Sequence, residues 1–100
     1  MNISENIKKI HEEVTTWRHE LHANPELCYE ENWTAEYITE KLKSFGIEVH
    51  NKIGKTGVIG VLKGSNSQEH KSNRSIGLRA DMDALPIEEE NNFDYKSKFL

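Results

Sequence analysis

Apolar residues near the start of the chain recur at alternating steps of four and three, which is the spacing of one face of an amphipathic helix. The helix is expected from about Ser4 to His22, with Ser4 as N-cap, and Asn24-Pro25 ends it because the residue before proline avoids helical angles. A second helix is expected from about Glu31 to Phe45, with Gly46 just beyond its end. The two apolar stripes consist of Ile3, Ile7, Ile10, Val14, Trp17 and Leu21, and of Ala35, Ile38, Leu42 and Phe45.

After the second helix the apolar residues alternate with polar ones, which is the pattern of a half-exposed strand. Residues 47–51 and the more apolar residues 58–62 flank the turn Gly54-Lys55-Thr56-Gly57, so the pair is expected to form an antiparallel hairpin. Residues 75–80 are expected to form a third strand. Helices that precede such a sheet indicate an open α/β fold, in which ligands bind at the carboxyl ends of the strands.

Two aspartates follow the third expected strand. In an extended segment Asp81 and Asp83 point to the same side, with Cβ atoms about 6 to 7 Å apart. Two carboxylates this close repel each other unless a cation or an imidazolium lies between them, which favours a nearby metal site. Asp-x-Asp is also common in solvated turns, so the pattern alone leaves both interpretations open.

Histidine and cysteine offer weaker candidates. His19-Glu20-Leu21-His22 has one residue too few between the glutamate and the second histidine for a zincin motif, and nothing else on this helix supplies metal ligands. We expect the His22 ring to hold the helix end against the following loop by a hydrogen bond. Cys28 is expected to be a small buried side chain rather than a nucleophile, and Glu88 to Glu90 a solvated charge run.

Composition limits the class of protein. With 100 residues, 35% of them hydrophobic and 30% charged, the chain has at most one domain with a modest core. The net charge of −4 and the lack of a basic cluster argue against nucleic acid. A single cysteine and the absence of a signal-like or membrane-spanning apolar run predict a cytoplasmic protein. Phe93, Tyr95, Phe99 and Leu100 crowd apolar surface at the end, which suggests the front of a longer protein.

Several motifs, taken in order along the chain, carry a resemblance to a known family. The chain resembles the bacterial and plant amidohydrolases related to hippurate hydrolase, within the co-catalytic metallopeptidases that also include aminoacylase and carboxypeptidase G. The string Asp-Met-Asp-Ala-Leu-Pro is the most specific part of the resemblance. The matching segments are Trp17 to Leu27, Glu30-Glu31-x-x-Thr34, Phe45-Gly46-Ile47, Thr56-Gly57-Val58 and Ile76 to Pro86.

The resemblance implies that residues 1–100 are the amino-terminal part of an open-sheet, zinc-exopeptidase-like catalytic domain, which a smaller domain interrupts further along. It implies two divalent ions, zinc or manganese, in the complete enzyme, a small amide substrate such as an N-acyl or N-aroyl amino acid, and a homodimer or homotetramer. The family's ligands come from a Cys-Gly-His-Asp segment, a Glu-Glu pair and later histidines. The Cys-Gly-His-Asp segment does not occur before Leu100, so these residues alone are expected to be inactive and to bind no metal tightly.

The resemblance also implies roles for the two aspartates. The wider family has His-x-Asp at this strand end, and Asp83 matches the aspartate that orients a metal-bound histidine from behind. Asp81 stands in the histidine's place, where it assists Asp83 or is a weak candidate for a metal ligand. The alternative of a different class is a non-catalytic α/β module whose apolar end binds a partner or dimerises.

Overall fold

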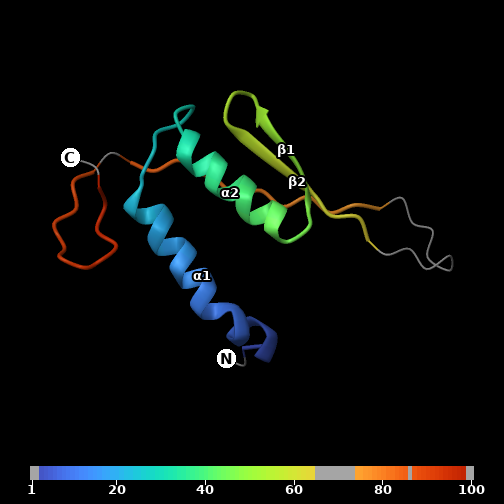
Figure 1. Ribbon diagram of the computed structural model, residues 1–100, viewed down its shortest axis with the longest axis horizontal. Helices are drawn as coiled ribbons and strands as arrows, with labels where there is room; N and C mark the ends of the chain where they lie inside the picture. Colours follow the sequence, from blue (N-terminus) through green and yellow to red (C-terminus); the bar gives the residue numbers. More distant parts are fainter. Residues whose placement is uncertain (1–2, 65–73, 86, 99–100) are drawn as a thin grey trace.

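The computed structural model describes residues 3–64, 74–85 and 87–98. Two helices, α1 (Glu5–Ala23) and α2 (Asn32–Ser44), are followed by two strands, β1 (Glu48–Ile53) and β2 (Gly57–Val61). Figure 1 shows α2 beside the hairpin and α1 leading away at an angle. The orange and red segments after the hairpin run back past α2 to the carboxyl end of α1 (Figure 1).

Helix α1 begins and ends as its sequence predicts. The Asn6 N–H donates to Ser4 Oγ at 3.3 Å, which confirms Ser4 as the N-cap. At the other end Asn24 donates from its side-chain amide to the Glu20 carbonyl at 2.9 Å. The apolar stripe of the first turns stays about half exposed, with Ile7 at 57% and Ile10 at 50%. The apolar spacing and the end caps therefore account for the formation of α1. The first turns of the helix contribute little to the buried core.

Helix α2 ends in a Schellman motif, which confirms the predicted place of Gly46. The Ile47 N–H donates to the Leu42 carbonyl at 3.1 Å and the Gly46 N–H to the Lys43 carbonyl at 2.9 Å. Gly46 has φ +76°, in the left-handed region that favours glycine. This turn aims the chain from α2 into β1.

Substituting Gly46 with alanine should lower the free energy of unfolding by about 1 kcal/mol, because an L side chain disfavours the left-handed backbone. A Cβ here would meet no atom within 4 Å, so the cost is that of the backbone alone. Urea unfolding of the variant measures it. Gly64→Ala is the matched control, since a Cβ at Gly64 also meets open space and its φ is not positive. Equal midpoints for both variants would contradict the prediction.

The predicted hairpin is confirmed. Strands β1 and β2 pair antiparallel, with Glu48 opposite Val61 and Ile53 opposite Gly57. A Cβ on Gly57 would lie 2.5 Å from the Ile53 carbonyl oxygen, so the turn requires glycine there. On β2, the position of a Cβ on Gly60 lies 3.3 Å from the Leu42 side chain, so the hairpin packs closely on α2.

The predicted third strand is wrong for the described chain. Residues 75–80 are described but form neither strand nor helix. Ile76 is 90% exposed and Leu78 97% exposed, so their apolar side chains have no covering layer among the described residues. A strand exists only when a neighbour takes its backbone hydrogen bonds, and the described sheet consists of β1 and β2. The α/β composition stands, but an open sheet is not present in the described part of the chain.

Long side chains join α1 to α2. The Trp17 ring packs on the Phe45 ring, with centroids 5.7 Å apart, and Lys41 Nζ lies 5.6 Å from the centre of the Trp17 ring. The Tyr37 hydroxyl donates to the Glu20 carboxylate. Burial, together with this bond to an anion and its charge, raises the pKa of Tyr37 to about 12. The two helices are thus held by aromatic and charged groups.

Burial in the described chain is mostly polar. Ala23 is its one buried hydrophobic residue, while Cys28 is exposed, so the expectation of a buried cysteine is wrong. None of the described helices has the length and apolar character needed to cross a membrane. The buried polar residues are Glu31, Thr34, Thr39 and Thr56. Glu31, Thr34 and Thr56 form hydrogen bonds with the loop between α1 and α2 or with each other, whereas the Thr39 hydroxyl has no partner among the described residues.

Candidate functional site

The carboxylate of Glu26 caps α2 from the preceding loop. Its Oε1 accepts the Thr34 N–H and the Thr34 hydroxyl, both at 2.6 Å, and its Oε2 accepts the Trp33 N–H at 3.1 Å. The first N–H groups of a helix have no partner within the helix, so these bonds satisfy donors that would otherwise be unpaired. Glu31, which precedes α2 directly, makes no side-chain capping bond.

The bonds at Glu26 favour its charged form. Burial alone would raise the pKa of this carboxyl group, but the hydrogen bonds from Thr34, Trp33 and Asn32 outweigh it and lower the pKa below the usual 4.5. A negative charge at a helix N-terminus is also favourable because it lies at the positive end of the helix dipole. Glu26 is therefore an ionised anchor at the start of α2.

A second carboxylate, Glu31, ties the hairpin to this loop. Glu31 is only 5% exposed, and it accepts the Tyr29 N–H at 2.6 Å and the Thr56 hydroxyl at 2.5 Å. Thr56 belongs to the turn between β1 and β2 and is itself buried. Glu26 and Glu31 lie in the segments that carry the family resemblance, but the sequence predicted no structural role for either residue. The available signal was the placement of acids just ahead of an apolar helical stripe, where they suit the helix dipole.

The Asp-x-Asp segment lies against the same loop. The Ala84 N–H donates to the backbone carbonyl of Glu26 at 2.8 Å, so the residues before Ala84 are held near the carboxyl end of α1. There they line a cavity of about 300 Å³ together with residues of both helices. The lining residues are Arg18, Leu21, His22, Asn24, Pro25, Thr34, Ile38, Asp81, Met82, Asp83 and Ala84.

Both aspartates are exposed in this arrangement. The Asp81 side chain is 80% exposed and lies 3.7 Å from the Arg79 guanidinium, an exposed ion pair of little energetic weight. Asp83 is exposed as well. No group of three or more histidine, cysteine, aspartate or glutamate side chains in the described ranges could hold a metal ion.

His22 bonds a distant residue rather than the following loop, so that detail of the prediction is wrong. Its Nε2 lies 3.1 Å from Glu89 Oε2, and the Glu89 side chain is only 12% exposed. Hydrogen bonds from Asn91 first, and then from His22, lower the pKa of Glu89 despite burial. Glu89 is therefore not a solvated residue of a charge run. Its bond to His22 holds residues 87–98, the late segment, against α1.

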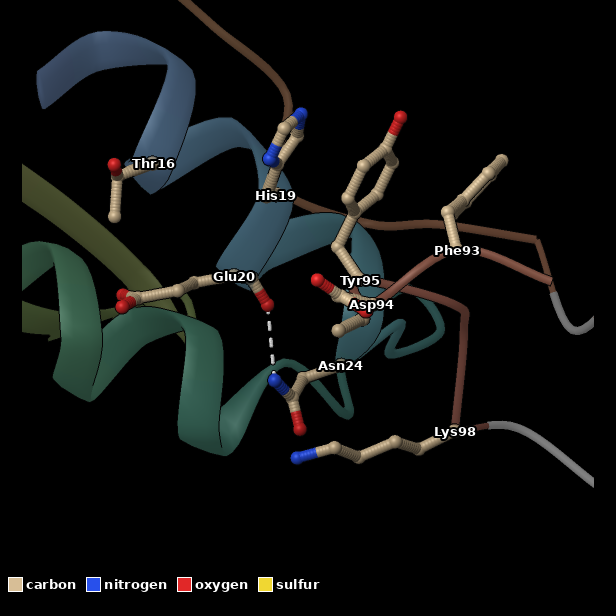
Figure 2. A pocket seen from close by; sticks show the side chains of 9 residues that line it. Thr16, His19, Glu20, Asn24, Phe93, Asp94, Tyr95 and Lys98 are labelled. Carbon is tan, nitrogen blue, oxygen red and sulfur yellow. Dashed lines mark hydrogen bonds between the residues drawn. The ribbon is translucent and has the colours of Figure 1, made fainter. Parts of the chain in front are cut away.

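His19 faces a separate cavity of about 580 Å³ between α1 and the late segment (Figure 2). Its ring stacks on Tyr95 with centroids 3.6 Å apart, and Tyr95 stacks in turn on Phe93 at 4.1 Å. The Lys98 N–H donates to the Ala23 carbonyl at 2.8 Å, which closes this segment onto the helix end. Phe93 and Tyr95 thus pack against α1, while Phe99 and Leu100 lie outside the described residues.

The chain is similar to characterised hydrolases over nearly its whole length. It is 51% identical to hippurate hydrolase of Campylobacter jejuni over 98 residues, which cover 98% of this chain and 24% of that protein. It is 44% identical to the N-acyl-L-amino acid amidohydrolase of Geobacillus stearothermophilus, with 94% of this chain and 25% of that protein covered. It is 39% identical to thermostable carboxypeptidase 2 of Saccharolobus solfataricus, with 98% and 25% covered.

No protein-family model and no solved structure matches the chain. The chain spans about a quarter of the length of the three relatives named. Identities of 39 to 51% that extend along 94 to 98% of the chain agree with the family expected from the Asp-Met-Asp-Ala-Leu-Pro string and its companions. The chain therefore belongs to the family of amidohydrolases and carboxypeptidases that includes hippurate hydrolase.

Proposed function

We propose that the complete protein is a metal-dependent amidohydrolase that cleaves the amide bond of N-acyl or N-aroyl amino acids, and that residues 1–100 belong to its catalytic domain. The observation that carries this proposal is the 51% identity to hippurate hydrolase over 98% of the chain. The names of the other two relatives, an N-acyl-L-amino acid amidohydrolase and a carboxypeptidase, describe the same bond type. The proposal includes a homodimer or homotetramer and a cytoplasmic location.

In this proposal the complete enzyme would bind two divalent ions, zinc or manganese, which would supply a water molecule with its pKa lowered toward about 7. The described residues act beside the ions. Asp83 accepts a hydrogen bond from an imidazole ligand and so fixes the tautomer and orientation of that ring, and Asp81 assists it. The backbone bond from Ala84 to Glu26 supports this role because it holds both carboxylates at one cavity.

The purified complete protein should release glycine from N-benzoylglycine, or an amino acid from another N-acyl amino acid, when Mn²⁺ or Zn²⁺ is present. Chelation of divalent ions should abolish turnover and readdition of the metal should restore it, because the chelator removes the group that activates water. Quantifying the released amino acid measures the reaction. Failure to turn over any N-acyl amino acid, with metal bound and the protein folded, would remove the proposed function.

A second candidate is a non-catalytic α/β module that binds a partner or dimerises. The exposure of Ile76 at 90% and Leu78 at 97% favours it, because large exposed apolar side chains often mark interaction surfaces. This candidate predicts that the 100-residue chain folds cooperatively by itself and that the complete protein has no hydrolase activity. The assay above therefore separates the two candidates.

A further inference from the structure

We propose that Glu26 is a positioning residue, which holds Asp83, and with it the Asp81–Asp83 pair, against the carboxyl end of α1. The inference rests on the proposed function, since Glu26 affects the reaction only if Asp83 does. Glu26 is suited to this because it bonds in two directions. Its carboxylate is fixed to the start of α2, and its backbone carbonyl accepts the N–H of Ala84.

Glu26 is itself firmly held. Three donors converge on its carboxylate, two of them at 2.6 Å from Thr34, which is only 4% exposed. Hydrogen bonds to a charged acceptor are shorter and stronger than neutral ones. Pro25, just before Glu26, has a fixed φ that further restricts the loop. The carbonyl of Glu26 is therefore a rigid acceptor rather than one on a mobile loop.

The bond from Ala84 to Glu26 fixes the backbone at Asp83. The N–H of Ala84 lies in the same peptide plane as the carbonyl group and the Cα of Asp83, because the peptide bond is planar. A hydrogen bond of 2.8 Å to a rigid acceptor therefore sets the orientation of that plane and the place of the Asp83 Cα. The Asp83 carboxylate starts from this Cα, and Asp81 lies two residues back on the same segment. Among the described residues, this is the backbone hydrogen bond that joins residues 75–85 to the loop between α1 and α2.

The test compares Glu26→Gln with Glu31→Gln in the complete protein. Glutamine keeps the shape and one acceptor oxygen, but at Glu26 it removes the charge and presents an NH₂ group to donors such as Trp33 N–H. Glu31 is the matched control because it is a second hydrogen-bonded carboxylate of the same loop, and its bonds go to Tyr29 and Thr56. Both variants weaken the loop, but only Glu26 contacts the segment that carries Asp83.

We expect Glu26→Gln to lower kcat for N-benzoylglycine by about tenfold with little change in KM, the range known for partners that orient metal ligands. Exchange of the Ala84 amide proton with solvent, followed by mass spectrometry or NMR, should become about tenfold faster because its acceptor is no longer held rigidly. Glu31→Gln should leave both quantities near those of the unmodified protein. Equal loss of kcat in the two variants would show a general structural effect and overturn the inference.

A double variant sharpens the test. If Glu26 acts through Asp83, adding Glu26→Gln to Asp83→Asn should lower kcat no further than Asp83→Asn does alone. Two losses that multiply would overturn the inference. If Asp83→Asn by itself leaves kcat and metal content unchanged, the role of Asp83 in the proposed function fails. A loss with Asp83→Asn but none with Glu26→Gln removes only the role of Glu26.

Should Glu26→Gln fold poorly, Ala84→Pro tests the same contact from its other side. Proline has no N–H, so this change removes the donor and leaves the bonds between Glu26 and α2 in place. The same loss of kcat is expected, with amide exchange in the first turn of α2 unchanged. Unchanged kcat in a folded Ala84→Pro variant would overturn the inference.

Discussion

Replacing Asp83 with asparagine in the complete protein should lower kcat/KM for N-benzoylglycine by 10- to 100-fold, the range seen when a residue that orients a metal ligand is lost. Asparagine keeps the size of the side chain but removes the negative charge and one acceptor oxygen. In the proposed role the carboxylate would accept the imidazole N–H and raise the basicity of that ring, which an amide does less well. Steady-state kinetics and the metal content of the purified protein measure the effect.

Asp81→Asn is the informative comparison for Asp83→Asn. Asp81 is 80% exposed and paired with the exposed Arg79 at 3.7 Å, so its loss should change kcat/KM less than the loss of Asp83. The two residues share a segment and a cavity, which makes the pair closely matched. Unaltered kinetics and metal content in Asp83→Asn would exclude this residue from the site, and a larger loss in Asp81→Asn would exchange the two roles.

Glu26→Ala should make the start of α2 less stable by about 2 kcal/mol, because the buried Thr34 N–H and hydroxyl lose a charged acceptor. The effect corresponds to roughly 30-fold faster exchange of the Thr34 amide proton, which mass spectrometry or NMR measures locally. Gly64→Ala, which lies outside α2, should leave this rate unchanged. Protection of Thr34 that survives in Glu26→Ala would mean that another group caps the helix.

The contribution of Glu26 should also disappear in acid. Its pKa is lowered in the folded protein, so the stabilisation is complete above about pH 4.5 and is lost as the pH falls through the lower folded-state value. After correction for intrinsic exchange rates, the difference between the unmodified protein and Glu26→Ala should shrink on acidification from pH 7. A difference that stayed constant to pH 3 would contradict the assignment of a charged cap.

Local sequence signals predicted the elements whose causes are local. Ser4 caps α1, Gly46 ends α2 in a left-handed turn, and the hairpin turns where glycines flank Lys55 and Thr56. Each of these depends on residues within about six positions of one another, which is the range over which periodicity and capping patterns operate. The family could also be predicted from the sequence, because the Asp-Met-Asp-Ala-Leu-Pro string occurs together with the other motifs in a fixed order.

Features that depend on distant residues were missed. Residues 75–80 have the alternation of a strand, but whether they pair is decided by a neighbour that the pattern does not identify. His22 finds its partner 67 residues away at Glu89, and Glu26 bonds both Thr34 and Ala84. The support of a metal ligand by Asp83 stays a prediction.

The contacts between α1 and α2 give the protein a natural optical reporter. Trp17 of α1 lies against Phe45 with the Lys41 ammonium nearby, and Trp33 of α2 stacks on Tyr37 with ring centroids 5.1 Å apart. Both indoles therefore sit where the two helices meet or where α2 begins. Only the Trp17 contact joins the two helices, so the emission of Trp17 should change with helix docking, while Trp33, whose partner Tyr37 is also in α2, serves as an internal reference.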